Sequence, residues 1–306
     1  MGMKKLVFIT AGDPLGIGPE ITVKALRSKR VQAMCRPVVL GDGATLAKAG
    51  WTDELGGLLP IDTVPTLKGA PRPTAAGGIT SFKAVQAGIK LALQTGNPLI
   101  TAPISKQSWA LAGVPFTGHT EVLRAQTGAD GLMMFVSGAL RCALVTEHFA
   151  VADLSRLLTK TRVQQTALHF IDALQRLGIK NPRIALCALN PHASDNGQFG
   201  MEENNVLIPV VENLKQRGLL AEGPLPTDTA WLSHTHRQYD GLLCMYHDQA
   251  LAPLKLAAKE PIVHLTAGLP FLRTSPAHGT AFDIAGKNKA DPSSMESAIL
   301  FAMKKI

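Results

Sequence analysis

The chain has 306 residues, of which 46% are hydrophobic and 18% are charged, and its formal net charge is +8. This composition excludes a disordered chain and predicts a large buried core, and a chain of this length forms about two domains or one large α/β unit. No apolar run approaches the roughly 20 residues of a membrane-spanning helix, and the first apolar stretch is too short for a signal peptide. We therefore expect a cytoplasmic protein that does not bind membranes.

The basic residues are scattered along the chain, and aromatic residues make up only 5% of it. Nucleic-acid-binding proteins usually show a basic stripe, with aromatic stacking platforms where they bind single strands. We therefore expect no nucleic-acid partner, and an anionic small substrate explains the positive surplus equally well. The cysteines are widely spaced and form no C-x-x-C pair, which favours reduced core residues: Cys35, Cys142, Cys187 and Cys244.

Apolar runs of strand length alternate with amphipathic stretches almost from end to end. Runs that are hydrophobic at nearly every position, as in strands covered on both faces, occupy residues 6–10, 37–40, 98–102, 132–136, 143–146, 183–189, 241–245 and 262–265. Helical patterns lie between them, as at 82–93, 162–177 and 202–217. This alternation predicts an α/β fold with largely parallel sheets. The segment 59–78, rich in Pro, Gly and Thr, is the most linker-like part of the chain.

A glycine-rich turn follows the first predicted strand. Its sequence from Gly12 to Glu20, GDPLGIGPE, leads into a predicted helix. The context suits a phosphate-binding loop, but the glycines do not match G-x-G-x-x-G and the Walker lysine is missing. We interpret the segment as a structurally demanding turn near the site, with dinucleotide binding as the alternative.

Three histidines follow three buried strands. His148 ends the run RCALVTEH, His192 ends RIALCALNPH, and His247 lies in GLLCMYHDQ. Ligands gather at the carboxyl ends of parallel strands, and three neutral imidazoles with an open coordination position are typical of a catalytic metal site. The alternative for each is a hydrogen-bonded loop histidine. His234 and His236 form an H-x-H pair, but positions i and i+2 do not share a helix face, so we expect both to be solvated.

A second loop rich in small residues covers residues 268–286, with the sequence GLPFLRTSPAHGTAFDIAG. Its glycines allow a ligand to approach the backbone, and Arg273 can hold a carboxylate or a phosphate. Asp283 can accept hydrogen bonds from ribose hydroxyls, as an acidic residue does in NAD sites. The alternative is a helix cap and turn at Ser275 and Pro276, with Asp283 solvated.

Several of these motifs together resemble the 4-hydroxythreonine-4-phosphate dehydrogenase family of vitamin B6 biosynthesis. They are GDPLGIGPE, PFTGHTE, ALNPHAS, MYHDQ and the 268–286 loop, and they span nearly the whole chain in order. The last loop is also similar to the adenosine-binding loop of isopropylmalate and isocitrate dehydrogenases. The resemblance implies their fold, with two α/β/α domains and a cleft between them. We expect a terminal domain of residues 1–125 and 268–306 with the nucleotide-binding loop, and a central domain of residues 126–267 with the metal site and the dimer contacts.

The resemblance also implies the site residues. Residues that match divalent-metal ligands, for Zn, Mg or Co, are His148, His192 and His247, and Lys255 joins them as a catalytic position. Residues that match substrate-binding positions are His119, Thr120, Lys255, His264 and Arg273. Residues that match cofactor-binding positions in the last loop are Gly268, His278, Gly279, Thr280 and Asp283.

The implied activity is the NAD-dependent (or NADP-dependent) oxidation of 4-phosphooxy-L-threonine by a homodimer with a shared active site. The product, 2-amino-3-oxo-4-phosphooxybutanoate, is a β-keto acid that loses CO2 to give 3-amino-2-oxopropyl phosphate in pyridoxal 5'-phosphate biosynthesis. His264 stands where the family usually has Asn, which favours as an alternative a related metal-dependent dehydrogenase of D-threonate or D-erythronate 4-phosphate. A non-catalytic protein that binds phosphorylated metabolites is a further alternative, and the intact histidines argue against it.

Overall fold

The computed structural model describes residues 4–61 and 71–304, so residues 62–70 of the predicted linker lie outside the described part. The chain divides into two compact units. Unit 1 comprises Met1–Gly131 and Val263–Ile306, and unit 2 comprises Leu132–Ile262. The sequence predicts domain boundaries at 125/126 and 267/268, and the two units divide at 131/132 and 262/263. Both chain ends belong to unit 1.

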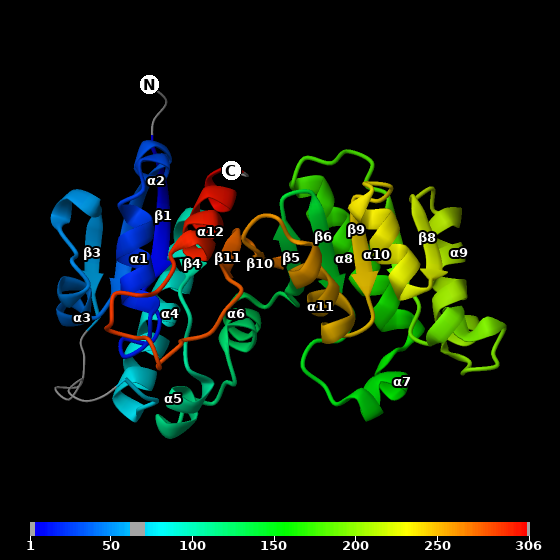
Figure 1. Ribbon diagram of the computed structural model, residues 1–306, viewed down its shortest axis with the longest axis horizontal. Helices are drawn as coiled ribbons and strands as arrows, with labels where there is room; N and C mark the ends of the chain where they lie inside the picture. The colour runs from blue at the N-terminus through cyan, green and yellow to red at the C-terminus, as the bar shows by residue number, and fades with distance from the viewer. Residues whose placement is uncertain (1–3, 62–70, 305–306) are drawn as a thin grey trace. The chain divides into compact units, whose positions relative to one another are not determined.

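Unit 1 contains a mostly parallel sheet with the strand order β3-β2-β1-β4-β11-β10 (Figure 1). The strands are β1 (Lys5–Thr10), β2 (Cys35–Gly41), β3 (Gly57–Pro60), β4 (Leu99–Thr101), β10 (Val263–Ala267) and β11 (Arg273–Pro276). Strand β11 runs parallel to β4 and antiparallel to β10. The last strands of the chain thus complete a sheet that the first residues begin.

Both faces of this sheet are buried, as the continuous apolar runs predict. Val7 and Ile9 of β1 belong to one core cluster, whereas Phe8 belongs to the cluster on the opposite face. The first cluster is built with α1 (Gly18–Leu26), α2 (Lys29–Met34), α3 (Gly43–Lys48) and α12 (Ser293–Lys304). The second is built with α4 (Ala75–Thr95), α5 (Lys106–Leu111) and α6 (His119–Thr127).

Unit 2 contains a second sheet segment with the strand order β5-β6-β9-β7-β8. Its strands are β5 (Leu132–Ser137), β6 (Leu140–Leu144), β7 (Ile184–Cys187), β8 (Ala221–Leu225) and β9 (Gly241–Cys244). Strands β5 and β6 form an antiparallel hairpin, and the other pairs are parallel. The helices are α7 (Leu154–Leu157), α8 (Lys160–Arg176), α9 (Ile208–Gln216), α10 (Thr227–Thr235) and α11 (His247–Ala257).

The α/β class and the largely parallel strands that the sequence predicts are confirmed. Three strands went unpredicted: β3, β8 and β11. β8 contains Gly223 and Pro224, and β11 (RTSP) is polar at most positions, so neither shows a strand pattern. The predicted helix at 202–217 is confirmed as one helical stretch, in which a π-helical segment, Glu203–Leu207, continues directly into α9.

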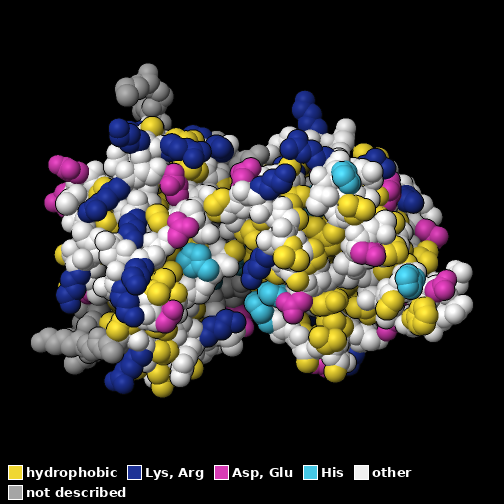
Figure 2. All heavy atoms as spheres, viewed as in Figure 1, with side chains coloured by type: hydrophobic (Ala, Val, Ile, Leu, Met, Phe, Trp, Pro, Cys, Tyr) yellow, Lys and Arg dark blue, Asp and Glu magenta, His cyan; other side chains and the backbone are white. Residues whose placement is uncertain are grey.

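The cysteines are free thiols in the core, and charged side chains of both signs lie on the surface. All four cysteines are free and buried, and Cys187 Sγ lies 3.8 Å from Cys244 Sγ. Figure 2 shows Lys and Arg side chains interspersed with acidic and apolar ones on the face in view. Among the described residues, no helix has the length and apolarity that crossing a membrane requires.

Candidate functional site

In unit 1, the strand register gathers polar side chains around Arg273. Strand β10 pairs with β11 so that Thr266 lies opposite Arg273 and His264 lies opposite Ser275. Residues two apart on a strand share a face, so these four side chains lie on one side of the sheet. On the other neighbour of β11, Leu99 of β4 is the partner of Arg273, which brings Thr101 near the same guanidinium.

Arg273 is 1% exposed, and neutral groups surround its guanidinium. Its Nη2 donates to Thr101 Oγ1 at 2.6 Å, and its Nη1 donates to Thr266 Oγ1 at 2.9 Å and to His264 Nδ1 at 3.3 Å. Its Nε has no hydrogen-bond partner among the described residues, and none of their carboxylates forms an ion pair with it.

Burial lowers the pKa of Arg273 to about 9, so the side chain remains charged at neutral pH. A buried charge without a counter-charge is unfavourable in the folded state, and an added anion would relieve that cost. A guanidinium presents a planar fork of donors that matches a carboxylate or a phosphate. The arrangement is therefore suited to bind an anionic group of a ligand.

His264 completes this cluster as a neutral side chain. Because a guanidinium can only donate, Nδ1 of His264 accepts from Arg273, and the Ser275 hydroxyl lies 3.2 Å from the same nitrogen. The proton of the neutral ring is therefore on Nε2. His264 thus accepts a hydrogen bond from Arg273 through one nitrogen and carries a donor on the other.

His119 and Thr120 begin α6, next to the same cluster. Burial lowers the pKa of His119 well below its usual value, and the charge of Arg273 lowers it further. The His119 ring packs edge-on against Trp109, with ring centroids 5.9 Å apart, and its buried Nε2 has no hydrogen-bond partner among the described residues. A neutral imidazole beside Arg273 can bind a ligand oxygen without adding charge repulsion. The structure thus brings together three of the five predicted substrate-binding residues, His119, His264 and Arg273, and Thr120 follows His119 in α6.

In unit 2, two of the three predicted metal ligands lie side by side. The rings of His148, which follows β6, and His247, which begins α11, have centroids 5.4 Å apart. They line an open pocket of about 190 Å³ with Glu147, Phe149, Val151, Leu154, Tyr246 and Asp248. The parallel pairing of β6 with β9 places these two strand ends next to each other, as the sequence pattern predicts.

The protonation of His247 suits metal binding. Its Nδ1 lies 2.8 Å from Asp248 Oδ1, and a carboxylate can only accept, so Nδ1 carries a proton and the neutral ring presents its lone pair on Nε2. A carboxylate on the far nitrogen is the usual arrangement around metal-bound histidines.

The third predicted ligand, His192, is exposed on the loop that follows β7. From His192 to Asn196 the backbone is left-handed, with φ between 44° and 69°. Within residues 4–61 and 71–304, no group of three or more His, Cys, Asp or Glu side chains is arranged to hold a metal ion. The donor chemistry fits a divalent metal and two imidazoles are adjacent, so the three-histidine site stays a prediction.

Lys255 is exposed near the end of α11. His234, in contrast, is not solvated as the sequence suggested: it is 1% exposed. Its Nε2 accepts from the Arg141 backbone N–H at 3.0 Å, and its Nδ1 lies 3.1 Å from the Tyr239 carbonyl oxygen. The H-x-H pair therefore splits, with His234 in the core and His236 exposed.

The two glycine-rich segments lie against each other in unit 1. The Ile17 N–H donates to the Thr280 carbonyl oxygen at 2.9 Å, and a Cβ at Gly16 would meet Thr280 at 3.0 Å. Of the predicted cofactor-binding residues, His278, Gly279 and Asp283 are exposed and Thr280 is half-buried. A Cβ added at Gly268 or Gly279 would meet nothing within 4 Å, so ligands can approach the backbone there.

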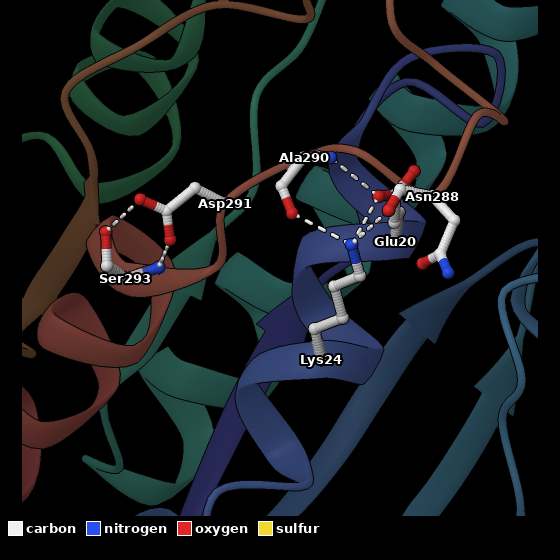
Figure 3. A network of polar contacts seen from close by, with 6 residues as sticks. All are labelled: Glu20, Lys24, Asn288, Ala290, Asp291 and Ser293. Carbon is white, nitrogen blue, oxygen red and sulfur yellow. Dashed lines mark hydrogen bonds and ion pairs between the residues drawn. The ribbon is translucent and has the colours of Figure 1, made fainter.

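A network of polar contacts ties the segment just after the 268–286 loop to α1 (Figure 3). Lys24 Nζ contacts Glu20 Oε1 at 2.7 Å and donates to the carbonyl oxygens of Asn288 and Ala290. Glu20 Oε1 also accepts from the Ala290 N–H at 2.8 Å. The segment that directly follows the predicted nucleotide-binding loop is therefore held by α1.

Residues 33–302 match the model of the family described as pyridoxal phosphate biosynthetic protein PdxA. The chain belongs to this PdxA family. A 4-hydroxythreonine-4-phosphate dehydrogenase of Geobacter metallireducens is 40% identical over 98% of this chain and 95% of its own length. A D-threonate 4-phosphate dehydrogenase of Cupriavidus necator is 39% identical over 96% of this chain and 95% of its own. The crystal structure of a 4-hydroxythreonine-4-phosphate dehydrogenase from Klebsiella pneumoniae matches with a TM-score of 0.88 and 32% identity, over 99% of this chain and 98% of that chain.

Several residues of this candidate site were missed from the sequence. Thr101, Thr266 and Ser275 hold Arg273 or His264, and Asp248 contacts His247. The signal for Thr266 was present: in VHLTA, His264 and Thr266 alternate with apolar residues, which is typical of one polar face of a strand. RTSP shows no such alternation, because its first three residues are all polar.

Proposed function

We propose that the chain oxidises 4-phosphooxy-L-threonine to 2-amino-3-oxo-4-phosphooxybutanoate, which then loses CO2 to give 3-amino-2-oxopropyl phosphate. Family membership and the names of the relatives support a dehydrogenase of this kind. The single observation that carries the proposal is Arg273, a buried guanidinium with neutral partners that is suited to an anionic substrate group.

The residues of unit 1 have defined roles in this proposal. Arg273 binds the phosphate or the carboxylate of the substrate, and Thr101 and Thr266 hold the guanidinium fork in place. His119 and His264 bind substrate oxygens as neutral imidazoles. Thr120, at the start of α6, is a further substrate-binding residue. Lys255, exposed on α11, is a further substrate-binding cation in this proposal.

When bound, a divalent ion (Zn, Mg or Co) supplies a Lewis acid for the substrate hydroxyl, and NAD or NADP supplies the hydride acceptor. His148, His192 and His247 would hold the ion, and Asp248 keeps the proton of His247 on Nδ1. Gly268, His278, Gly279, Thr280 and Asp283 would hold the cofactor, on a loop whose glycines leave the backbone accessible.

A second candidate substrate is D-threonate or D-erythronate 4-phosphate. His264 favours it, because an imidazole with its proton on Nε2 replaces the amide that the family usually has beside Arg273. The relative from Cupriavidus necator is named a D-threonate 4-phosphate dehydrogenase and is almost as similar as the one from Geobacter metallireducens.

The role of Arg273 is tested by its replacement with Met, which has a similar length and no charge. Removing a buried uncompensated charge leaves the ligand-free protein about as stable as the parent. We expect 4-phosphooxy-L-threonine to raise the unfolding temperature of the parent and to do so much less in Arg273→Met, with binding about 10- to 100-fold weaker. Arg141→Met is the matched control, since Arg141 is half-buried in unit 2 and donates to carbonyl oxygens. Equal stabilisation of Arg273→Met and the parent would refute the assignment.

Substrate choice is tested by steady-state rates on both classes of substrate. We expect the parent to show the higher kcat/KM on 4-phosphooxy-L-threonine. If it strongly prefers D-threonate or D-erythronate 4-phosphate, the second candidate replaces the first. His264→Asn separates the contribution of this position, because it should move the ratio of the two kcat/KM values toward 4-phosphooxy-L-threonine.

We further propose a homodimer with a shared active site, in the cytoplasm. The exposed apolar side chains of Phe149, Val151, Phe199 and Met201, between 49% and 75% exposed, support an interface on unit 2. Light scattering should give twice the monomer mass, and a monomer at micromolar concentration would refute the dimer.

A further inference from the structure

The three predicted metal ligands emerge from three neighbouring strands, in the order β6-β9-β7. Met245, just past the end of β9, links the first two of these strands. Its carbonyl oxygen accepts from the backbone N–H of Thr146 at 3.1 Å and from Thr146 Oγ1 at 2.6 Å. The segment that leads to His148 is therefore fastened to the segment that leads to His247.

Gln249 links the second strand end to the third. Its Oε1 accepts from the Met245 N–H at 2.6 Å, and its Nε2 donates to the Ala188 carbonyl oxygen at 2.6 Å and to Thr227 Oγ1 at 2.8 Å. Met245 N can only donate and Ala188 O can only accept, so the carboxamide has a single satisfied orientation. The side chain is 5% exposed, which makes each of these bonds costly to lose.

The hydrogen bonds of Gln249 lie on the chain segments that carry His247 and His192. The bond to Met245 closes a short loop, with His247 midway between its two ends. The bond to Ala188 holds the strand end from which the chain proceeds to His192. A glutamine in the first turn of a helix often caps the preceding backbone, and the bond to Met245 does this for α11. The bond to Ala188 is not needed for a cap, because it crosses to another strand.

Glu203 continues the same connection. Its Oε1 accepts from the backbone N–H groups of Leu189 and Asn190, both at 2.8 Å, and it is fully buried in the π-helical turn. The chain between Ala188 and His192 is thus held on one side by Gln249 and on the other by Glu203.

We propose that Gln249 is a positioning residue, which joins the ends of β7 and β9 and so fixes how the segments carrying His192 and His247 leave the sheet. The assignment rests on the proposed function, in which these histidines hold a divalent metal. Gln249 itself is not a ligand in this proposal, since both ends of its carboxamide are used within the protein.

The test is a titration of the metal-free full-length protein with Co2+ alone, followed by visible absorption. Gln249→Glu keeps an acceptor for Met245 and loses the donor to Ala188, and Gln249→Met loses both. The matched control is Trp231→Phe, which removes the hydrogen bond from Trp231 Nε1 to the Gln249 carbonyl oxygen and leaves the carboxamide in place. Urea unfolding of each variant reports stability separately from Co2+ binding.

We expect both Gln249 variants to bind Co2+ about 10- to 100-fold more weakly, with altered absorption bands, while Trp231→Phe keeps the parental affinity and spectrum. If the Gln249 variants bind Co2+ like the parent, the positioning role is wrong and the proposed function stands. If the parent itself binds no Co2+, the metal in the proposed function fails, and this inference fails with it. If Trp231→Phe loses as much Co2+ affinity as the Gln249 variants while all are equally stable, the effect comes from packing in this region in general, and the assignment is wrong. Failure of both Gln249 variants to fold would overturn it as well.

Discussion

At the scale of single residues, His234 shows how burial decides the state of a titratable group. Its ring accepts from the Arg141 N–H through Nε2, which leaves Nδ1 to donate to the Tyr239 carbonyl oxygen. This pattern requires the neutral ring, and burial is the main cause that lowers its pKa from 6.5 to about 4. The unfolded chain therefore binds a proton at a higher pH than the folded protein does.

The sign of the pH effect follows directly. The neutral His234 contributes its full stability above pH 6.5, and this contribution is lost as the pH falls through the window from 6.5 to about 4. We expect acidification from pH 7 to 4 to lower the free energy of unfolding of the parent by about 3 kcal/mol more than that of His234→Gln, which does not titrate. Urea unfolding at a series of pH values measures the difference, and parallel curves for the two proteins would contradict it.

At the scale of elements, α4 and α5 pack so closely that only glycine fits at one position. A Cβ at Gly78 of α4 would lie 2.1 Å from the Ser108 carbonyl oxygen of α5. Nearby, the buried Asp13 of the GDPLGIGPE turn accepts from Ser108 Oγ at 2.7 Å. The turn, α4 and α5 are therefore fixed to one another beside the strand ends of unit 1.

Gly78→Ala should force these helices apart. We expect it to destabilise the protein by about 1–3 kcal/mol relative to Gly88→Ala, measured by urea unfolding. Gly88 is the matched control, because it lies in the same helix and gains the same helix propensity. A Cβ there would meet side-chain atoms, Leu99 Cδ1 at 2.8 Å and Thr10 Cγ2 at 3.0 Å, rather than the backbone of another helix. Equal effects of the two substitutions would show that α5 moves without cost.

The elements also show where sequence reasoning succeeds and where it fails. Strands such as β1 and β9 are predictable because parallel strands buried on both faces must be apolar at nearly every position. Strand β11 is not predictable in this way, because Arg273 depends on hydrogen bonds to residues of other strands. These partners are Thr101 of β4 and Thr266 of β10. His148 and His247 could be paired from strand order, whereas the backbone of the His192 loop follows from long-range contacts such as those of Glu203.

At the scale of the whole molecule, the two units differ in how the chain builds them. Unit 2 is one continuous segment, Leu132–Ile262. Unit 1 needs both chain ends, because β11 completes the sheet beside β4 and α12 joins the core cluster around β1. The two units should therefore behave differently as fragments.

We expect residues 132–262 to fold when expressed alone, with a cooperative thermal transition followed by circular dichroism. We expect residues 1–131 alone to show no such transition, because they lack β10, β11 and α12. Mixing fragment 1–131 with fragment 263–306 is the control, since it restores the missing pieces. A cooperative transition of fragment 1–131 by itself would show that the terminal pieces are dispensable.

The uncompensated guanidinium of Arg273 has a consequence for the protein in the cell. If the anionic substrate binds Arg273 as proposed, it stabilises the folded state, and the supply of that metabolite then affects how well the protein resists proteolysis. Cells that lack the phosphorylated metabolite should degrade the protein faster. The half-life of the Arg273→Met variant should be the same with and without the metabolite.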